Sequence, residues 1–150
     1  MKIFIPIKHD SQRVPRKNFR IFDGEPLFKH TLLKLVDHEV HIDTDSQVVI
    51  DEVRKDERLK HVTAYRRPHS LMGHEVSVCD LIKNFIVTQD IESPIVQIHV
   101  TSPFLKVKTL EDAFCKLESH DSVVSCNIYN SRFWRKEQYG FCPVNHNPLK

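Results

Sequence analysis

Residues 2–20, KIFIPIKHDSQRVPRKNFR, join an apolar run to a strongly basic loop. The run over residues 3–7 has the length and the side-chain bulk of a buried β-strand. The loop after it carries five basic side chains: Lys8, Arg13, Arg16, Lys17 and Arg20. Ligands of open α/β sheets bind at the carboxyl ends of the strands, so the loop favours a polyanionic ligand.

Downstream of this loop, predicted helices alternate with predicted strands. Helices are predicted over residues 26–38, 46–55, 77–88 and 109–117, and further strands over 40–43, 61–65, 95–100 and 122–128. Asp45 is a plausible cap of the second helix, and Thr109 with Asp112 resembles a capping box that opens the fourth. Residues 129–150 show no clean period and predict a loop-rich segment.

Strands that alternate with helices predict an α/β protein with a mostly parallel sheet, because parallel neighbours need crossover connections. Right-handed crossovers place helices on both faces of such a sheet. At 150 residues, without repeats or low-complexity tracts, the chain is predicted to form a single domain.

Composition narrows the class of function. A net charge of only +2 argues against a nucleic-acid partner and favours a small anionic ligand. No apolar stretch approaches the roughly 20 residues that span a bilayer, and the N-terminus does not resemble a signal peptide, so we expect a cytoplasmic protein without membrane contact.

Neither the cysteines nor the histidines show the spacing of a metal site. The four cysteines form no C-x-x-C pair, which favours free thiols over disulfides. The ten histidines include no H-x-x-x-H or H-E-x-x-H pattern. His38 and His41 are separated by a predicted helix end, and His146 lies in the predicted loop, so we assign no histidine to a metal.

Four polar segments follow predicted strands and should share one edge of a parallel sheet: residues 8–18, 43–45, 66–68 and 101–103. They offer cations for phosphates, hydroxyls and amides for a base or sugar, and carboxylates for a metal or ribose, which suits a nucleotide. Neither G-x-x-x-x-G-K-[ST] nor G-x-G-x-x-G is present, so phosphate binding would depend largely on side chains. Arg13 and Lys17 can neutralise a triphosphate, while Ser11 and Asn18 supply hydrogen bonds. The alternative is a solvated basic turn.

Other candidate residues have two interpretations each. Asp43 and Asp45 can hold Mg²⁺ or ribose hydroxyls, but Asp45 can equally cap a helix. Arg67 can meet phosphate or only pair with a surface carboxylate. Ser77 opens the predicted helix at 77–88, so it can be its N-cap or a ligand contact. His99 can be a satisfied core histidine or, near the end of its strand, a substrate contact.

The motifs IPIKHDSQRVPRKNFRIFDGEPL, IDTDS, RRP and HVTSPFL resemble, in order, those of the acylneuraminate cytidylyltransferase (CMP-sialic acid synthetase) family. The similarity covers residues 3–113, with a weaker echo in SVVS at 122–125. It implies a nucleotide-diphospho-sugar transferase fold, in which a hydroxyl of an acidic, sialic acid-like sugar attacks the α-phosphate of CTP and releases pyrophosphate. It further implies Mg²⁺ as cofactor and allows a homodimer.

By matching positions, the resemblance assigns roles to ten residues. It implies catalytic cations at Lys8, Arg13 and Lys17, nucleotide contacts at Ser11, Asn18, Arg67, Ser77 and Thr101, and sugar contacts at His99 and Ser102.

The chain departs from the family pattern in two ways. His74 stands where Asp is common and His99 where Gln is common. Family members are also longer, with metal-binding carboxylates in a C-terminal part, so residues 1–150 are expected to be a cytidylyltransferase-like domain without that part. The alternative is a noncatalytic nucleotide-binding relative or a fragment of such an enzyme. An RNA-binding protein is less favoured because no aromatic stacking motif is recognisable.

Overall fold

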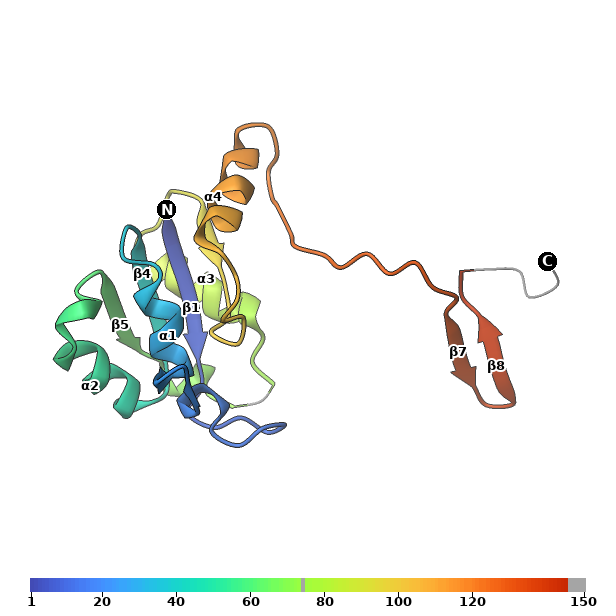
Figure 1. The fold of residues 1–150 in the computed structure, drawn as a ribbon, viewed down its shortest axis with the longest axis horizontal. Helices are drawn as coiled ribbons and strands as arrows, with labels where there is room; N and C mark the ends of the chain where they lie inside the picture. Colours follow the sequence, from blue (N-terminus) through green and yellow to red (C-terminus); the bar gives the residue numbers. More distant parts are fainter. Residues whose placement is uncertain (74, 146–150) are drawn as a thin grey trace.

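The computed structural model describes residues 1–73 and 75–145, and its centre is a four-stranded sheet (Figure 1). The strands are β1 (Lys2–Ile7), β4 (Glu39–Thr44), β5 (Val62–Arg66) and β6 (Ile95–Gln97). All pair in parallel, in the order β5-β4-β1-β6. The apolar run therefore forms an interior strand with a neighbour on each side, and the predicted α/β class is confirmed.

The connections between these strands contain the main helices. They are α1 (Leu27–Leu33), α2 (Gln47–Lys55) and α3 (Val78–Thr88), and α4 (Val107–Cys115) follows β6. Short 3-10 helices are η1 (Lys17–Phe19), η2 (Glu57–Leu59), η3 (His69–Leu71) and η4 (Lys116–Glu118). Two antiparallel hairpins complete the fold: β2 (Ile21–Phe22) with β3 (Glu25–Pro26), and β7 (Trp134–Glu137) with β8 (Gly140–Pro143).

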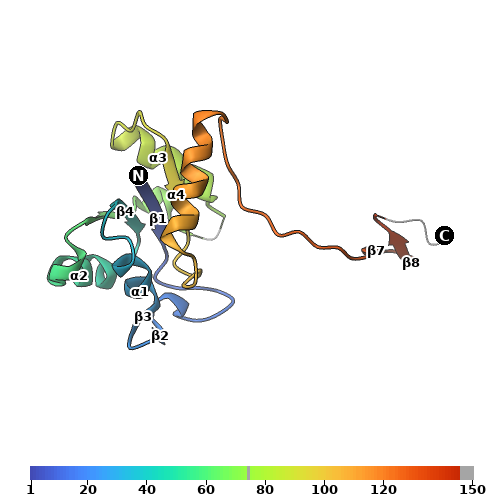
Figure 2. The ribbon, with the colours of Figure 1, turned by 45° about the horizontal axis from the view of Figure 1, so that its top comes forward.

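Alternating residues of β1 face two separate apolar layers. Ile3, Ile5 and Ile7 are fully buried in a core that includes residues of α1, α2 and α4, whereas Phe4 packs with Leu81 and Phe85 of α3. The chain crosses from β5 back past β1 to β6, opposite to the direction from β1 through β4 to β5. Right-handed crossovers that run in opposite directions lie on opposite faces of a sheet, so α3 covers the face opposite to α1 and α2. The prediction of helices on both faces is thus confirmed (Figure 2).

Several predicted element ends were wrong. α1 ends at Leu33, because the chain turns there toward β4 through short-range bonds such as that from the Leu35 N–H to the Leu32 carbonyl, 3.0 Å. The cap of α2 is Ser46, whose Oγ accepts from the Val49 N–H at 3.4 Å. α4 begins at Val107 without a capping box, since Thr109 already lies within its first turn. β6 ends at Gln97, short of residue 100.

The segment over residues 122–128 is not a strand, contrary to the prediction. Val124 and Ile128 are 83% and 93% exposed, and no ladder joins the segment to a described strand, so its apolar pattern has no face to cover. The segment leads to the β7–β8 hairpin, which stands apart from the sheet in both views (Figures 1 and 2). The hairpin lies in the region that was predicted to be a loop, where residues 138–139 join Glu137 to its ladder partner Gly140.

The prediction of free thiols is confirmed. All four cysteines are free thiols. Over residues 1–73 and 75–145, no group of three or more His, Cys, Asp or Glu side chains could hold a metal ion, and no helix is long and apolar enough to cross a membrane. His74 and His146 lie outside the described residues.

A buried histidine makes stability depend on pH. His41 of β4 contacts the Tyr65 hydroxyl at 3.1 Å and a Glu39 carboxylate oxygen at 2.9 Å, and its ring lies 5.0 Å from that of Phe85. Burial lowers the pKa of His41 and the charge of Lys2 adds to this, while Glu39 opposes both. The unfolded chain therefore binds a proton near pH 6.5 that the folded chain resists, and the free energy of unfolding should fall as the pH drops below that value.

We expect urea titrations between pH 7.5 and 5 to show this fall in the wild-type protein and a shallower fall in His41→Phe, which keeps the ring and cannot titrate. The two proteins differ only at residue 41, so the difference between the two profiles isolates His41. If the free energy of unfolding fell equally with pH in both proteins, the pH dependence could not be assigned to His41.

Candidate functional site

The topology places a candidate site between the carboxyl ends of β1 and β6. From β1 the chain moves to β4 on one side, and β6 later joins the opposite side of β1. The helix that follows β1, α1, and the helix that leads into β6, α3, therefore lie on opposite faces of the sheet. Ligands of open α/β sheets bind outside the carboxyl ends of the strands at the point where the strand order reverses in this way.

A pocket of about 480 Å³ lies at this reversal, within the usual range for ligand sites. All the predicted site residues except Ser77 and Ser102 line it. The lining also includes residues to which the sequence analysis gave no role, namely Pro6, Asp10, Gln12, Val14, Val76, Val78, Leu81 and Val100. Val78 and Leu81 belong to the regular apolar pattern of α3, which signalled core packing and gave no hint of a ligand wall.

The basic loop is held by polar contacts at its two ends. Asn18 is buried, and its Nδ2 donates to the Lys8 carbonyl at 2.9 Å. The His9 N–H donates to the Asp45 carboxylate at 2.7 Å, and the His9 Nδ1 lies 2.9 Å from the Ser46 Oγ. Asp45 thus anchors the loop, and the prediction that it caps α2 was wrong. These contacts fix where Arg13 and Lys17 can reach.

Arg67 follows β5 and is fully buried beside the pocket. Its Nε donates to the Asp43 carboxylate and its Nη2 to the Asp43 backbone carbonyl at 3.1 Å. Burial raises the pKa of Asp43, and the charge of Arg67 works against that rise. The carboxylate partner is buried, not at the surface as one interpretation held. The Arg67 Nη1 has no hydrogen-bond partner among the described residues, which leaves one buried donor beside the pocket.

His99 and Thr101 supply the wall on the side of β6. The His99 side chain is exposed, so its interpretation as a core histidine was wrong. The surrounding protein atoms lower the pKa of His99, and the charge of Lys17 adds to this effect. A lowered pKa keeps the imidazole neutral at pH 7, able both to donate and to accept a hydrogen bond. Ser102 makes a turn, its N–H donating to the His99 carbonyl at 3.2 Å.

Ser77 forms a complete capping box at the start of α3. Its Oγ accepts from the Asp80 N–H at 3.1 Å, and the Asp80 carboxylate accepts from the Ser77 N–H at 3.1 Å. The Ser77 Oγ also donates to this carboxylate at 2.7 Å, and this bond, together with the one from the Ser77 N–H, lowers the pKa of Asp80. Val76 and Val78 on either side of Ser77 line the pocket, whereas Ser77 does not.

Replacing this serine separates its two predicted roles. Ser77→Ala should lower the free energy of unfolding by about 1 kcal/mol through loss of the cap. If Ser77 only caps α3, the affinity of CTP measured by calorimetry should be unchanged. A tenfold loss of affinity would instead support the predicted nucleotide contact. Ser70→Ala, at a serine of η3 outside the pocket lining, is the control for serine removal.

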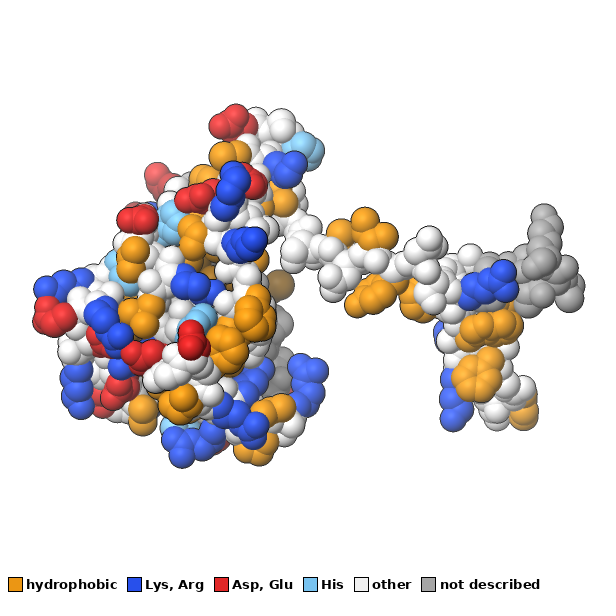
Figure 3. All heavy atoms as spheres, in the orientation of Figure 1, with side chains coloured by type: hydrophobic (Ala, Val, Ile, Leu, Met, Phe, Trp, Pro, Cys, Tyr) orange, Lys and Arg blue, Asp and Glu red, His pale blue; other side chains and the backbone are white. Residues whose placement is uncertain are grey.

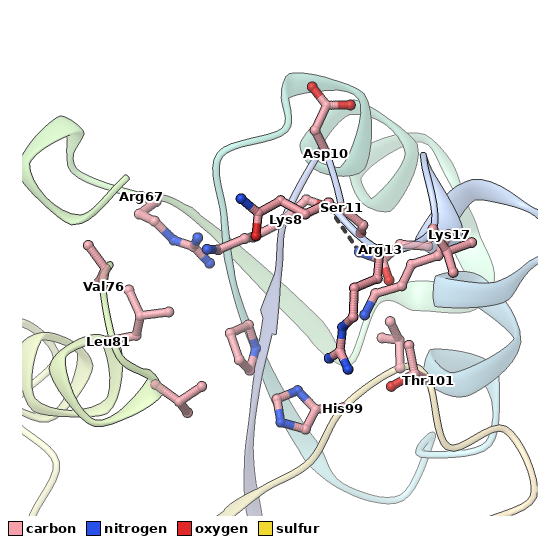
Figure 4. A pocket seen from close by; sticks show the side chains of 16 residues that line it. Lys8, Asp10, Ser11, Arg13, Lys17, Arg67, Val76, Leu81, His99 and Thr101 are labelled. Carbon is pink, nitrogen blue, oxygen red and sulfur yellow. Dashed lines mark hydrogen bonds between the residues drawn. The ribbon is translucent and has the colours of Figure 1, made fainter. Parts of the chain in front are cut away.

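The pocket has two chemically different walls (Figure 4). Val76 and Leu81 form an apolar side, and Arg13 and Lys17 reach in from the opposite side, toward His99 and Thr101. Lys8 crosses between them, and its Nζ donates to the Gly73 carbonyl at 2.6 Å. Lys and Arg side chains also gather on the outer surface at the lower edge of the molecule (Figure 3). Such a pocket can hold a ligand with a flat apolar part and a multiply charged anionic part.

Comparisons with known proteins agree with this geometry. Residues 3–135 match the family model described as cytidylyltransferase. The chain is 23% identical over 123 residues to an N-acylneuraminate cytidylyltransferase of Streptococcus agalactiae serotype V (strain ATCC BAA-611 / 2603 V/R), covering 78% of this chain and 29% of that protein.

A solved structure has a similar fold, with a TM-score of 0.62 at 20% identity, over 81% of this chain and 48% of that one. It is CMP:2-keto-3-deoxy-manno-octonic acid synthetase complexed with CTP. The chain thus spans less than half the length of either relative. The resemblance that the motifs carry is confirmed, and the chain belongs to the cytidylyltransferase family.

Proposed function

We propose that this chain carries the nucleotide site of an enzyme that transfers CMP from CTP to an acidic, sialic acid-like sugar. The observation that carries the proposal is the meeting of the basic loop after β1 with the segment after β6 in one pocket. Membership of the cytidylyltransferase family supports CTP as the nucleotide, and the names of the two relatives support an acidic sugar as the acceptor.

In this proposal the two walls divide the substrate. The apolar side formed by Val76 and Leu81 contacts the cytosine, and the hydrogen-bonding groups of Asn18, Arg67 and Thr101 hold the rest of the nucleoside. Lys8, Arg13 and Lys17 contact the triphosphate, with Ser11 donating to a phosphate oxygen. His99 and its neighbour Ser102 face the acceptor sugar.

In the transfer of CMP, the protein mainly has to position the substrates and stabilise negative charge. The oxygen of a sugar hydroxyl forms a bond to the α-phosphorus and gives up its proton to solvent, while the bond from that phosphorus to the pyrophosphate oxygen breaks. Arg13 and Lys17 stabilise the negative charge that moves onto the pyrophosphate, and the anchored loop holds them in place before the reaction. The neutral imidazole of His99 orients the sugar by hydrogen bonding.

The residues at the pocket fit Mg²⁺ only as an ion that is shared with the phosphates. Asp43 and Asp45 are engaged by Arg67 and His9, whereas Asp10 belongs to the pocket lining, with its carboxylate directed away from the cavity (Figure 4). Mg²⁺ is commonly bound by one or two carboxylates together with substrate phosphates. To hold such an ion, the Asp10 side chain would have to turn toward the phosphates, where the ion would neutralise phosphate charge.

A noncatalytic nucleotide-binding module is the second candidate. It is favoured by the engagement of Asp43 and Asp45, which leaves few carboxylates at the pocket for a metal, and both candidates share CTP binding. We expect CTP to bind more tightly than CMP at low salt, with added salt reducing the difference, because the contacts with the phosphates are cationic. Calorimetry with both nucleotides checks this, and equal affinities at low salt would overturn both candidates.

A measurement of pyrophosphate release distinguishes the enzyme from the noncatalytic module. The chain should bind CTP yet release pyrophosphate very slowly or not at all with Mg²⁺ and a panel of acidic sugars. Slow pyrophosphate release that requires one particular sugar would support the enzyme as the function. Brisk pyrophosphate release would show that the pocket on this chain is sufficient for turnover. Binding without any sugar-dependent release, even in a longer form of the protein, would favour the noncatalytic module.

A further inference from the structure

The segment over residues 98–105 leaves the sheet before it reaches the pocket. The ladder between β1 and β6 ends where Phe4 pairs with Gln97, followed by one bond from the Ile98 N–H to the Phe4 carbonyl at 3.2 Å. His99 and Thr101, which line the pocket, lie beyond these contacts. The sheet therefore does not fix the position of this wall.

Two side chains of the α1 region hold the segment instead. The Thr31 Oγ1 donates to the Val100 carbonyl at 3.2 Å, in a buried contact. The Lys34 Nζ donates to the Pro103 carbonyl and, at 3.3 Å, to the Leu105 carbonyl. Lys34 directly follows α1, with helical backbone angles, and stands three residues after Thr31, so the two side chains lie on the same side and together bind three carbonyls of the segment.

The environment of Lys34 is unusual for a lysine. It is partly buried, burial lowers its pKa, and it forms no ion pair with a carboxylate among the described residues. An ammonium group removed from water needs strong acceptors, and here backbone carbonyls are its acceptors. Placing a charge at this position has a cost that a purely packing residue, such as methionine, would avoid.

The segment is well suited to being held at these points. It folds into two successive turns, in which the Ser102 N–H donates to the His99 carbonyl and the Leu105 N–H to the Ser102 carbonyl at 3.1 Å. Phe104 also contacts Phe22 of the β2–β3 hairpin, with ring centroids 5.6 Å apart. Fixing the carbonyls at both ends of the turns fixes the residues between them.

We propose that Thr31 and Lys34 are positioning residues that hold the pocket wall formed by His99 and Thr101. Neither side chain lines the pocket, so both act through the segment. The inference rests on the proposed function only in naming what this wall contacts, the acceptor sugar at His99 and the nucleoside at Thr101. The positioning itself is a property of the folded chain and can be tested without a sugar.

The test compares two isosteric variants with a matched control. Lys34→Met removes two polar contacts to the segment and Thr31→Val removes one, and each variant keeps most of the side-chain volume. The control is Lys29→Met, the same change at a lysine within α1, which removes ion pairs of 2.8 Å to Glu52 and 3.1 Å to Asp56, both outside the segment. Lys34→Arg restores a charged donor.

Two readouts follow the segment. Hydrogen exchange over residues 98–106 should be about tenfold faster in Lys34→Met and Thr31→Val, and near the wild-type rate in Lys29→Met and Lys34→Arg. The pKa of His99, followed by NMR of its ring protons, should rise in both test variants as the segment moves into solvent. Thr31→Val carries no charge change, so a rise there cannot come from the loss of a lysine charge.

Unchanged exchange and an unchanged His99 titration in both test variants would overturn the inference, as would equal changes in Lys29→Met, which would indicate general loosening. CTP calorimetry on the wild-type protein is run alongside. If CTP does not bind while the segment still loosens in the test variants, the proposed function fails and the positioning role stands.

Discussion

Asp43→Ala is expected to lower the free energy of unfolding by about 3 to 5 kcal/mol, because it leaves the guanidinium of Arg67 buried without its counter-ion. The Arg67 side chain has no exposed surface, and the Asp43 side chain is 6% exposed. Solvent therefore cannot replace the lost carboxylate. Urea unfolding monitored by circular dichroism measures the change.

The matched control is Asp112→Ala, which removes the carboxylate of an exposed ion pair with Lys108 on α4. Exposed pairs contribute little, so this variant should stay close to the wild type. The double variant Asp43→Leu with Arg67→Met replaces the pair with apolar side chains and should recover most of the loss. A small effect of Asp43→Ala would show that Arg67 finds another partner or reaches water.

Arg13→Ala and Lys17→Ala should each weaken CTP binding by about 1.5 to 3 kcal/mol, the usual contribution of a hydrogen bond to a charged group. That corresponds to roughly a 10- to 150-fold rise in Kd. Both side chains line the pocket on the side opposite Val76 and Leu81 (Figure 4). Calorimetry at low salt measures the effect.

Arg20→Ala is the control for this pair, since it removes the same charge from the same loop at a residue that does not line the pocket. It should change the affinity far less, because an exposed charge acts at a distance through screened water. Equal losses in all three variants would mean that the loop attracts the nucleotide only by its overall charge. Unchanged affinity in Arg13→Ala and Lys17→Ala would overturn the proposed phosphate contacts.

The sequence by itself determined the central strand, the fold class and the edge of the sheet at which the basic residues lie. Residues 3–7 are apolar at every position, which predicts a strand covered on both faces, and β1 is an interior strand. The alternation of strands and helices determined the α/β class. Because the strands are parallel, their carboxyl ends meet at one edge, so the position of Lys8, Arg13 and Lys17 along the chain was enough to place them at the pocket.

Only the tertiary structure decided how residues far apart in the chain meet. Asp43 was predicted to hold Mg²⁺ or ribose hydroxyls, and Arg67 to meet phosphate or a surface carboxylate, whereas the folded chain buries the two side chains as a pair. The wall formed by Val76 and Leu81 is indistinguishable from core packing in a periodic pattern. The apolar residues 122–128 predicted a strand, but a strand also needs a neighbour to accept its hydrogen bonds, and the described residues supply none. Local patterns determine which face of an element is apolar, whereas the partner of that face is set by contacts across the whole chain.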